Sequence, residues 1–396
     1  MAGKSFVENC IKDVTVVDSH IILKQKINQR EAFFDDAYLK MASNAKKISV
    51  IAVMHLLDTG IPFVNVLQKY FSLECIIPKK NSINKNLLSF YPQEKILLLT
   101  REELKNIVSV KHILEKIPRE NKLILLDIGG YFSAIVNDIK DLFGGRFLGV
   151  IEDTENGHQK YFSQPNLFVP VISVARSPLK NNEDHLVGQA VVFSTDALLR
   201  EQGILINNKK VGVIGFGKIG NGILSSLRDK GCNISVYDTN PVVLISAYSK
   251  GNSISNKLKI IEGSDVIFCS TGQLSLRGEE FKFLKNGAFI VSVTSSDDEM
   301  DISWMEKNYT KKDVSERISF YENNGHCFYL LNNGNAINFL HGAVVDDFIL
   351  LVQKEMMDTL LYMSTASLEN GVQDGSSDVR SRIADSWLKY FLSISV

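Results

Sequence analysis

Short apolar runs alternate with helix-like segments through the first half of the chain. The apolar runs predict strands at 48–54, 96–99, 123–126 and 147–151. Helical patterns are expected between them, chiefly at 58–70 and 101–116. Apolar runs of this length, separated by helices, are typical of a parallel sheet that is covered on both faces. The first half therefore predicts an α/β domain that ends near Ser177.

The same alternation continues in the second half. A long helix is expected at 184–200, followed by strands at 211–214, 233–237, 266–269 and 288–293. Helical patterns at 344–363 and 379–392 close the chain, with a polar stretch at 368–378 between them. The sequence thus predicts an α/β fold with two doubly wound parallel-sheet domains, the second inserted late in the first. The expected segments are 1–183, 184–345 and 346–396.

One strand, turn and helix carry a glycine pattern with chemical meaning. The strand at 211–214 leads into Gly215-Phe216-Gly217-Lys218-Ile219-Gly220, which has the spacing G-x-G-x-x-G. In a dinucleotide-binding turn, Gly215 allows the tight turn, Gly217 admits a pyrophosphate, and Gly220 permits close helix packing. Lys218 and Ile219 then open a helix whose N–H groups face the phosphates.

An acidic residue completes this pattern. Asp238 ends the next predicted strand, where its carboxylate would accept hydrogen bonds from the adenosine ribose and repel a 2′-phosphate. Strand, turn, helix, strand and acid in register predict a Rossmann domain that binds NAD rather than NADP. A glycine-rich turn in another kind of α/β protein is the alternative.

Two further loops follow strands of the same domain. They contain Thr271-Gly272 and Thr294-Ser295. Ligands of open parallel sheets lie beyond the carboxyl ends of the strands, so both loops are expected to face the nicotinamide. Each loop taken alone is equally compatible with an ordinary tight β–α turn.

Composition and charge exclude several classes of protein. The 396 residues are 45% hydrophobic and 22% charged, as in ordinary globular proteins, and the net charge is −1. This balance gives no electrostatic case for binding nucleic acid or an anionic membrane. The N-terminal pattern predicts no signal peptide, and no apolar stretch of transmembrane length is expected. The five cysteines are scattered, which predicts neither disulfides nor a metal site and fits a cytoplasmic protein.

The order of the elements and several local strings resemble S-adenosyl-L-homocysteine hydrolase. The resemblance runs from about Ala45 to Met363 and is strongest at 52–55, 126–130, 177–188 and 211–241. In that family, bound NAD oxidises a ribose 3′-hydroxyl, the 5′ thiol leaves, water adds, and the ketone is reduced again. The resemblance implies the same redox-assisted chemistry on a small nucleoside or sugar-like substrate, in a homo-oligomer.

The resemblance assigns catalytic roles to three residues. Lys180 and Asp184 match the family's lysine and aspartate beside the 3′-hydroxyl, and His55 matches the histidine used in acid–base chemistry near C5′. A lysine acts as a base only if its pKa is lowered, and an acidic partner can orient it. From the residues alone, Lys180 and Asp184 are also compatible with a surface ion pair one helical turn apart.

Further residues are implied in binding. Asp153 matches a family acid that binds ribose hydroxyls, while Thr154 and Asn338 match contacts to NAD. Asp58 and Thr59 are expected either to cap the helix that follows them or to reach a substrate base, and capping is the simpler reading.

Some positions depart from the family pattern. Asp127-Ile128 replaces two adjacent aspartates, which leaves Asp127 as the candidate catalytic acid. Ser295 stands where the family has a histidine, and His185 stands where it has an asparagine, so that His185 is a candidate substrate-binding base. The NAD site and the 3′-oxidation pair persist, whereas groups for elimination and adenosine recognition are changed. The substrate therefore need not be S-adenosylhomocysteine.

Three functions follow from these patterns. The first is an NAD-dependent enzyme that transiently oxidises a ribose-type secondary alcohol and so enables thioether elimination and hydrolysis. The second is a catalytically silent NAD-binding regulator or partner subunit on the same scaffold. The third is a plain NAD-dependent sugar or nucleoside dehydrogenase that releases NADH.

Overall fold

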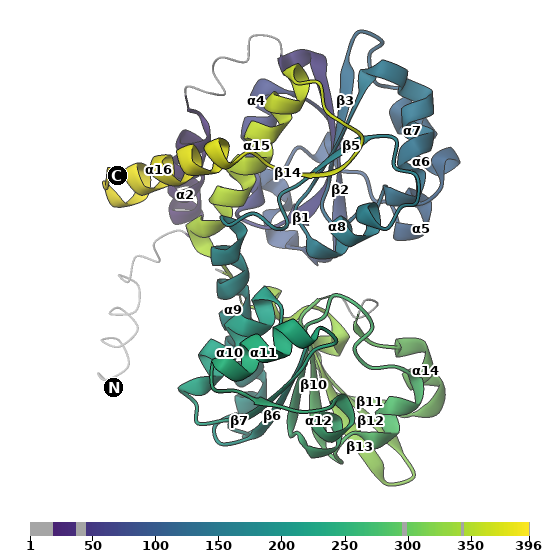
Figure 1. Cartoon of the computed structure of the whole chain (residues 1–396), viewed down its shortest axis with the longest axis vertical. Helices are drawn as coiled ribbons and strands as arrows, with labels where there is room; N and C mark the ends of the chain where they lie inside the picture. Colours follow the sequence, from purple (N-terminus) through teal and green to yellow (C-terminus); the bar gives the residue numbers. More distant parts are fainter. Residues whose placement is uncertain (1–18, 37–44, 295–298, 342–343, 396) are drawn as a thin grey trace, which may run out of the picture. The chain divides into compact units, whose positions relative to one another are not determined.

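The computed structural model describes residues 19–36, 45–294, 299–341 and 344–395. The chain forms two compact units, each with its own sheet. The first unit combines the chain up to Glu152 with Gln164–Ile172 and the chain from Leu350 onward. The second contains Asp153–Ser163 and Ser173–Ile349. The purple-to-blue and yellow segments in Figure 1 both belong to the first unit, which is therefore discontinuous in sequence.

A six-stranded sheet with the order β14-β5-β4-β3-β1-β2 forms the centre of the first unit. The pairs β1–β2, β1–β3 and β3–β4 are parallel. Strands β1, β3 and β4 are buried along nearly their whole length, because their near-continuous apolar runs are covered on both faces. The strands are β1 (Ile48–Leu56), β2 (Ser72–Ile83), β3 (Lys122–Asp127), β4 (Phe147–Glu152), β5 (Pro170–Ser173) and β14 (Gly371–Asp374).

Helices from both ends of the chain accompany this sheet (Figure 1). They are α2 (Ser19–Phe34), α4 (Gly60–Tyr70), α5 (Arg101–Leu104), α6 (Ile107–Leu114), α7 (Val136–Phe143), α15 (Ile349–Thr365) and α16 (Ser377–Leu392). Helix α15 is buried over most of its length, including charged Lys354 and Asp358, whose side chains pair at 2.6 Å. The late helix is therefore part of the core of this unit.

The second unit contains an eight-stranded sheet with the order β11-β12-β13-β10-β9-β6-β7-β8. All strands from β13 to β8 pair in parallel, whereas β11, β12 and β13 form an antiparallel meander at one edge. The strands are β6 (Lys210–Ile214), β7 (Asn233–Tyr237), β8 (Ser253–Ile254), β9 (Val266–Cys269), β10 (Ala288–Ser292), β11 (Thr310–Ser315), β12 (Ile318–Asn323) and β13 (His326–Leu331). The α/β fold with two parallel-rich sheets and a Rossmann-like second unit is confirmed.

Two helices of the second unit pack unusually close together. The helices of this unit are α8 (Glu155–Phe162), α9 (Lys180–Glu201), α10 (Lys218–Arg228), α11 (Pro241–Ser249), α12 (Lys257–Gly263) and α14 (Ile302–Asn308). Helices α9 and α10 lie side by side (Figure 1), with Gly188 facing Gly222. A Cβ on Gly188 would lie 2.6 Å from the backbone oxygen of Ile219. This close approach holds the start of α9 beside the glycine-rich turn that begins α10.

Three elements of the first half differ from the sequence prediction. No strand forms at 96–99, where only Ile96 makes an isolated bridge to Ile76 of β2. The expected helix at 101–116 is divided into α5 and α6, because the Asn106 side chain accepts a hydrogen bond from Val108 N–H and caps a new helix. Strand β2 was not predicted, since its sequence includes Pro78, two lysines and a glutamate. Proline and charge are tolerated there because β2 lies at the sheet edge.

The later differences have equally local causes. Helix α15 begins at Ile349 rather than at 344, because Asp346 has a φ of 44° that an α-helix excludes. The polar stretch at 368–378 contains the short strand β14. The β12–β13 hairpin turns through Asn324 and Gly325, both with positive φ, as a two-residue hairpin loop requires.

Candidate functional site

The glycine-rich turn connects β6 to α10 in the second unit. Gly215 has a φ of +94°, and a Cβ there would lie 2.6 Å from the backbone oxygen of Ser270. Ser270 Oγ donates a hydrogen bond of 2.7 Å to the Gly215 carbonyl, which ties the turn to the end of β9. Gly217 is the N-cap of α10, and a Cβ on it would meet no described heavy atom within 4 Å. The backbone is therefore open to a ligand at Gly217.

The acidic residue lies directly beside this turn. Asp238 follows β7, and its Oδ2 accepts a hydrogen bond of 2.8 Å from Phe216 N–H. Its Oδ1 accepts another from Asn240 N–H. A carboxylate oxygen accepts more than one hydrogen bond, so both oxygens retain capacity for ribose hydroxyls. Asp238 is thus held beside the glycine-rich turn, where the sequence pattern places the adenosine ribose.

The buried side-chain amide of Asn338 also bears on whether NAD fits this unit. Asn338 lies in the short 3₁₀ helix Ile337–Phe339, which packs against α9, and only 4% of the residue is exposed. Its Oδ1 has no hydrogen-bond partner among the described residues. A buried acceptor of this kind is costly unless a ligand satisfies it. A carboxamide N–H₂ group, such as that of nicotinamide, is a donor of the required kind.

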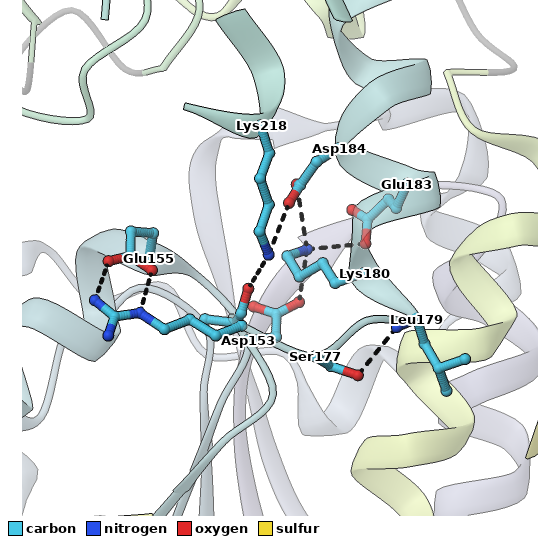
Figure 2. A network of polar contacts seen from close by, with 10 residues as sticks. Asp153, Glu155, Ser177, Leu179, Lys180, Glu183, Asp184 and Lys218 are labelled. Carbon is cyan, nitrogen blue, oxygen red and sulfur yellow. Dashed lines mark hydrogen bonds and ion pairs between the residues drawn. The ribbon is translucent and has the colours of Figure 1, made fainter. Parts of the chain in front are cut away.

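A cluster of charges surrounds the start of α9 (Figure 2). Lys180 Nζ lies 2.8 Å from Glu183 Oε2 and 4.0 Å from both Asp184 Oδ1 and Asp153 Oδ2. All four side chains are at most 12% exposed. Asp153 comes from the segment between β4 and α8, so residues distant in sequence converge on one ammonium. The prediction that Lys180 and Asp184 lie together is met, but within a buried group of three carboxylates.

Lys218 joins this cluster to the glycine-rich turn. Lys218 is the first residue of α10, and its Nζ lies 3.6 Å from Asp184 Oδ2 (Figure 2). The same Nζ donates a hydrogen bond of 2.9 Å to the Ala175 carbonyl. Burial lowers the pKa of Lys218, while Asp184 opposes that shift and Lys180 adds to it. The Lys218 side chain therefore points to the charged cluster, and only its backbone N–H group belongs to the expected phosphate site.

The pKa values of this cluster are strongly shifted. Burial alone would lower the pKa of Lys180, but Glu183, Asp153 and Asp184 together raise it above its usual range. Burial raises the pKa of Asp184, against the opposing effect of the two lysines. Lys180 is therefore held as an ammonium. A lysine that acts as a base by itself requires a lowered pKa, and the pKa of Lys180 is shifted in the opposite direction.

Glu299 is a functional candidate that the sequence did not reveal. It is fully buried, and its carboxylate accepts hydrogen bonds from Thr271 Oγ, Gly272 N–H, Ser275 Oγ and Thr294 Oγ. Burial raises the pKa of Glu299, and the hydrogen bonds oppose that shift. Glu299 thus clamps together the loops after β9 and β10, and the polar groups of Thr271, Gly272 and Thr294 are directed toward it.

We expect Glu299→Ala to lower the free energy of unfolding by about 3 kcal/mol or more, because buried donors lose their acceptor. Glu299→Gln should lower the free energy of unfolding by clearly less. One amide oxygen remains as an acceptor, and the hydroxyls of Thr271 and Ser275 can rotate to accept hydrogen bonds from the new amide N–H₂ group. Urea denaturation of both variants measures the difference. Equal losses for alanine and glutamine would contradict the clamp.

The first unit holds the remaining catalytic candidates. His55 follows the buried part of β1, and its Nδ1 hydrogen-bonds Ser82 Oγ of β2. Asp127 ends β3, where it is fully buried and accepts hydrogen bonds from Tyr131 and Phe132 N–H groups. These two bonds hold the Gly129-Gly130 turn. The catalytic role suggested for Asp127 stays a prediction, and its observed contacts are those of a turn-stabilising residue.

Neither candidate cap of α4 acts through its side chain. Thr59 is the N-cap residue but makes no side-chain cap hydrogen bond. Asp58 is directed instead to Arg30, with Nη1 and Oδ2 3.3 Å apart. The capping interpretation was therefore wrong for both residues. Substrate binding by Asp58 and Thr59 stays a prediction.

Two other described candidates lie in the second unit. Thr154 is the N-cap of α8, and its Oγ accepts a hydrogen bond from Gly157 N–H. His185 is half-buried on α9 one residue beyond Asp184, and its Nε2 lies 3.2 Å from Gln189 Nε2. Ser295 lies outside the described residues.

The described residues place limits on other kinds of site. No group of His, Cys, Asp and Glu side chains within them is arranged to hold a metal ion. A search of the same residues for helices with the length and hydropathy to cross a membrane found none.

Comparison with known proteins agrees with the dinucleotide motif. Residues 191–344 match the family model described as "S-adenosyl-L-homocysteine hydrolase, NAD binding domain". The match spans the glycine-rich turn, Asp238, the clamped loops and Asn338. The cofactor of this domain is therefore NAD.

Similar solved structures share low sequence identity with this chain. Dipicolinate synthase A chain from Bacillus subtilis is 11% identical with a TM-score of 0.45, covering 81% of this chain and 99% of that one. A transhydrogenase from Sinorhizobium meliloti is 11% identical with a TM-score of 0.41, covering 81% and 97%. D-lactate dehydrogenase from Escherichia coli is 15% identical with a TM-score of 0.41, covering 78% and 96%.

Proposed function

Residues 191–344 belong to the NAD-binding domain family of S-adenosyl-L-homocysteine hydrolase, and we propose that the whole chain is an NAD-dependent enzyme of this superfamily. It transiently oxidises a secondary alcohol of a nucleoside or sugar-like substrate and returns the hydride within the same cycle. Elimination and hydrolysis of a thioether is the reaction that the resemblance favours, on a substrate that can differ from S-adenosylhomocysteine.

One observation carries this proposal. Lys218 belongs to the first turn after the glycine-rich loop, and its ammonium lies 3.6 Å from Asp184, which in turn lies 4.0 Å from Lys180. The lysine–aspartate pair expected at the alcohol is therefore linked to the NAD-binding turn within one compact unit. A surface ion pair is not compatible with the burial of Lys180 and Asp184.

Different residues of the chain have different roles in this proposal. Bound NAD supplies a reversible hydride acceptor. The turn at Gly217 and the helix N-terminus of α10 bind its phosphates, Asp238 binds the adenosine ribose, and Asn338 binds the carboxamide. The Lys180 ammonium stabilises, by a hydrogen bond, the alkoxide that forms when the substrate hydroxyl loses its proton. The resemblance makes His55 the candidate for acid–base chemistry at the leaving group.

We expect NAD to remain bound through purification and to be released when the protein is denatured, as mass spectrometry would detect. Adding S-adenosylhomocysteine or another 5′-thioether nucleoside should produce a transient absorbance of reduced nicotinamide that then decays. Adenosine and homocysteine would appear from S-adenosylhomocysteine without net NADH if the strict family reaction is kept. Failure of every such nucleoside to reduce the bound cofactor would overturn the proposal.

The other outcomes identify the alternatives. NADH that accumulates with excess NAD would identify a plain dehydrogenase. A protein that binds NAD, reduces none of it with any nucleoside or sugar, and keeps its biological activity after Lys180→Ala would be a silent regulator.

A further inference from the structure

The nearest charge to the Lys180 ammonium is Glu183 rather than Asp184. The Nζ–Oε2 distance to Glu183 is 2.8 Å, a direct hydrogen bond, whereas both aspartates lie at 4.0 Å (Figure 2). Glu183 is one turn along α9 and has only 12% of its side chain exposed. A carboxylate so close to a buried ammonium can exchange a proton with it directly.

The cluster brings like charges close together. Two ammonium groups, Lys180 and Lys218, face the three carboxylates of Asp153, Glu183 and Asp184. Beyond Lys218 lies the exposed Glu155–Arg176 ion pair. Protonation of one carboxylate relieves its repulsion with the other two, so the cluster is able to accept a proton.

We propose that Glu183 is the proton acceptor for Lys180: it takes a proton from the Lys180 ammonium, and the resulting amine takes the proton of the substrate hydroxyl. The inference rests on the proposed function, which supplies the alcohol and the hydride acceptor. One N–H bond of Lys180 breaks as an O–H bond forms on Glu183. The amine lone pair then accepts the hydroxyl proton, which restores the ammonium. The net change is the transfer of one proton from the substrate to Glu183. Glu183 does not contact the substrate itself and acts on it only through Lys180.

The titration of the cluster sets the conditions for this transfer. Burial raises the pKa of Glu183, Lys180 lowers it, and Asp153 and Asp184 raise it, with a result of about 7. The pKa of Lys180 is raised above its usual range, so the proton rests on Lys180 and its transfer to Glu183 must be coupled to uptake of the substrate proton by the lysine. Below about pH 7 Glu183 holds a proton and cannot accept another. The oxidation rate should therefore rise with pH through this region.

The test begins with a measurement that needs no catalysis. In purified protein labelled with ¹³C at glutamate carboxyl groups, with no substrate added, one resonance should titrate near pH 7 and be absent in Glu183→Gln. Glu201→Gln is the matched control, because Glu201 is an exposed glutamate at the end of the same helix. It should retain the titrating resonance and the wild-type rate. A Glu183 resonance that stays ionised between about pH 5 and about pH 9 would overturn the inference.

The kinetic arm separates proton transfer from packing. Glu183→Gln keeps the shape and a hydrogen-bond acceptor for Lys180 but takes up no proton. We expect it to slow single-turnover oxidation of the substrate by about 10²-fold and to remove the rise with pH. Glu183→Asp should keep that rise with a moved midpoint. Loss of rate in Glu183→Gln with an unchanged pH profile would leave only a packing role and overturn the inference. A titrating Glu183 in a protein that oxidises no alcohol would overturn the proposed function instead.

Discussion

Replacing Lys180 with methionine should reduce the rate of substrate oxidation by about 10²- to 10⁴-fold, the usual contribution of a positioned proton donor or acceptor. Methionine fills similar space but carries neither charge nor exchangeable proton. Single-turnover formation of reduced nicotinamide is the measurement that isolates this step. NAD binding should persist, because the Lys180 side chain contacts the carboxylate cluster and not the glycine-rich turn.

Two controls keep this prediction specific. Lys180→Arg preserves the positive charge but does not give up a proton near neutral pH, so it should be nearly as slow as Lys180→Met. Lys259→Met changes an exposed lysine on α12 and should leave the rate unchanged. An arginine variant with the wild-type rate would show that charge alone is required. A methionine variant with the wild-type rate would remove Lys180 from the chemistry.

Gly215→Ala should weaken NAD binding at least tenfold and also lower the stability of the second unit. The backbone there has a φ of +94°, and the new Cβ would meet the Ser270 carbonyl at 2.6 Å. Strain of this kind costs about 1–3 kcal/mol, and the turn must move to relieve it. Because about 1.4 kcal/mol corresponds to a factor of ten in affinity, the loss should be plain in calorimetric titration with NAD.

Other glycines separate backbone strain from ligand contact. A Cβ on Gly217 meets no described atom within 4 Å and φ is ordinary there, so Gly217→Ala should weaken NAD binding without lowering stability. Gly203→Ala places alanine at a φ of +71° in open space, so it should lower stability slightly and leave NAD affinity unchanged. Wild-type NAD affinity in both Gly215→Ala and Gly217→Ala would contradict the location of the phosphate site.

The sequence determined the features that depend on neighbouring residues. The glycine-rich turn is specified locally, because only glycine adopts the φ of Gly215 without steric cost. The parallel strands around it are continuous apolar runs, and they lie where the pattern predicted them. Edge strands such as β2 and β14 escaped prediction, since one exposed side permits proline, charge and polar residues.

The tertiary structure decided the state of the charged groups. The spacing of Lys180 and Asp184 suggested a pair, but only the fold brings Asp153 and Lys218 to them and buries the whole set. Burial and long-range neighbours set the pKa of a side chain, so neither the raised pKa of Lys180 nor the role of Glu183 is readable from local sequence. The contacts of Glu299 also depend on the tertiary structure, because its four donors come from two loops that meet only when β9 and β10 pair. Sequence specified the glycine-rich turn of the NAD-binding domain, and tertiary contact specified which charged groups lie beside it.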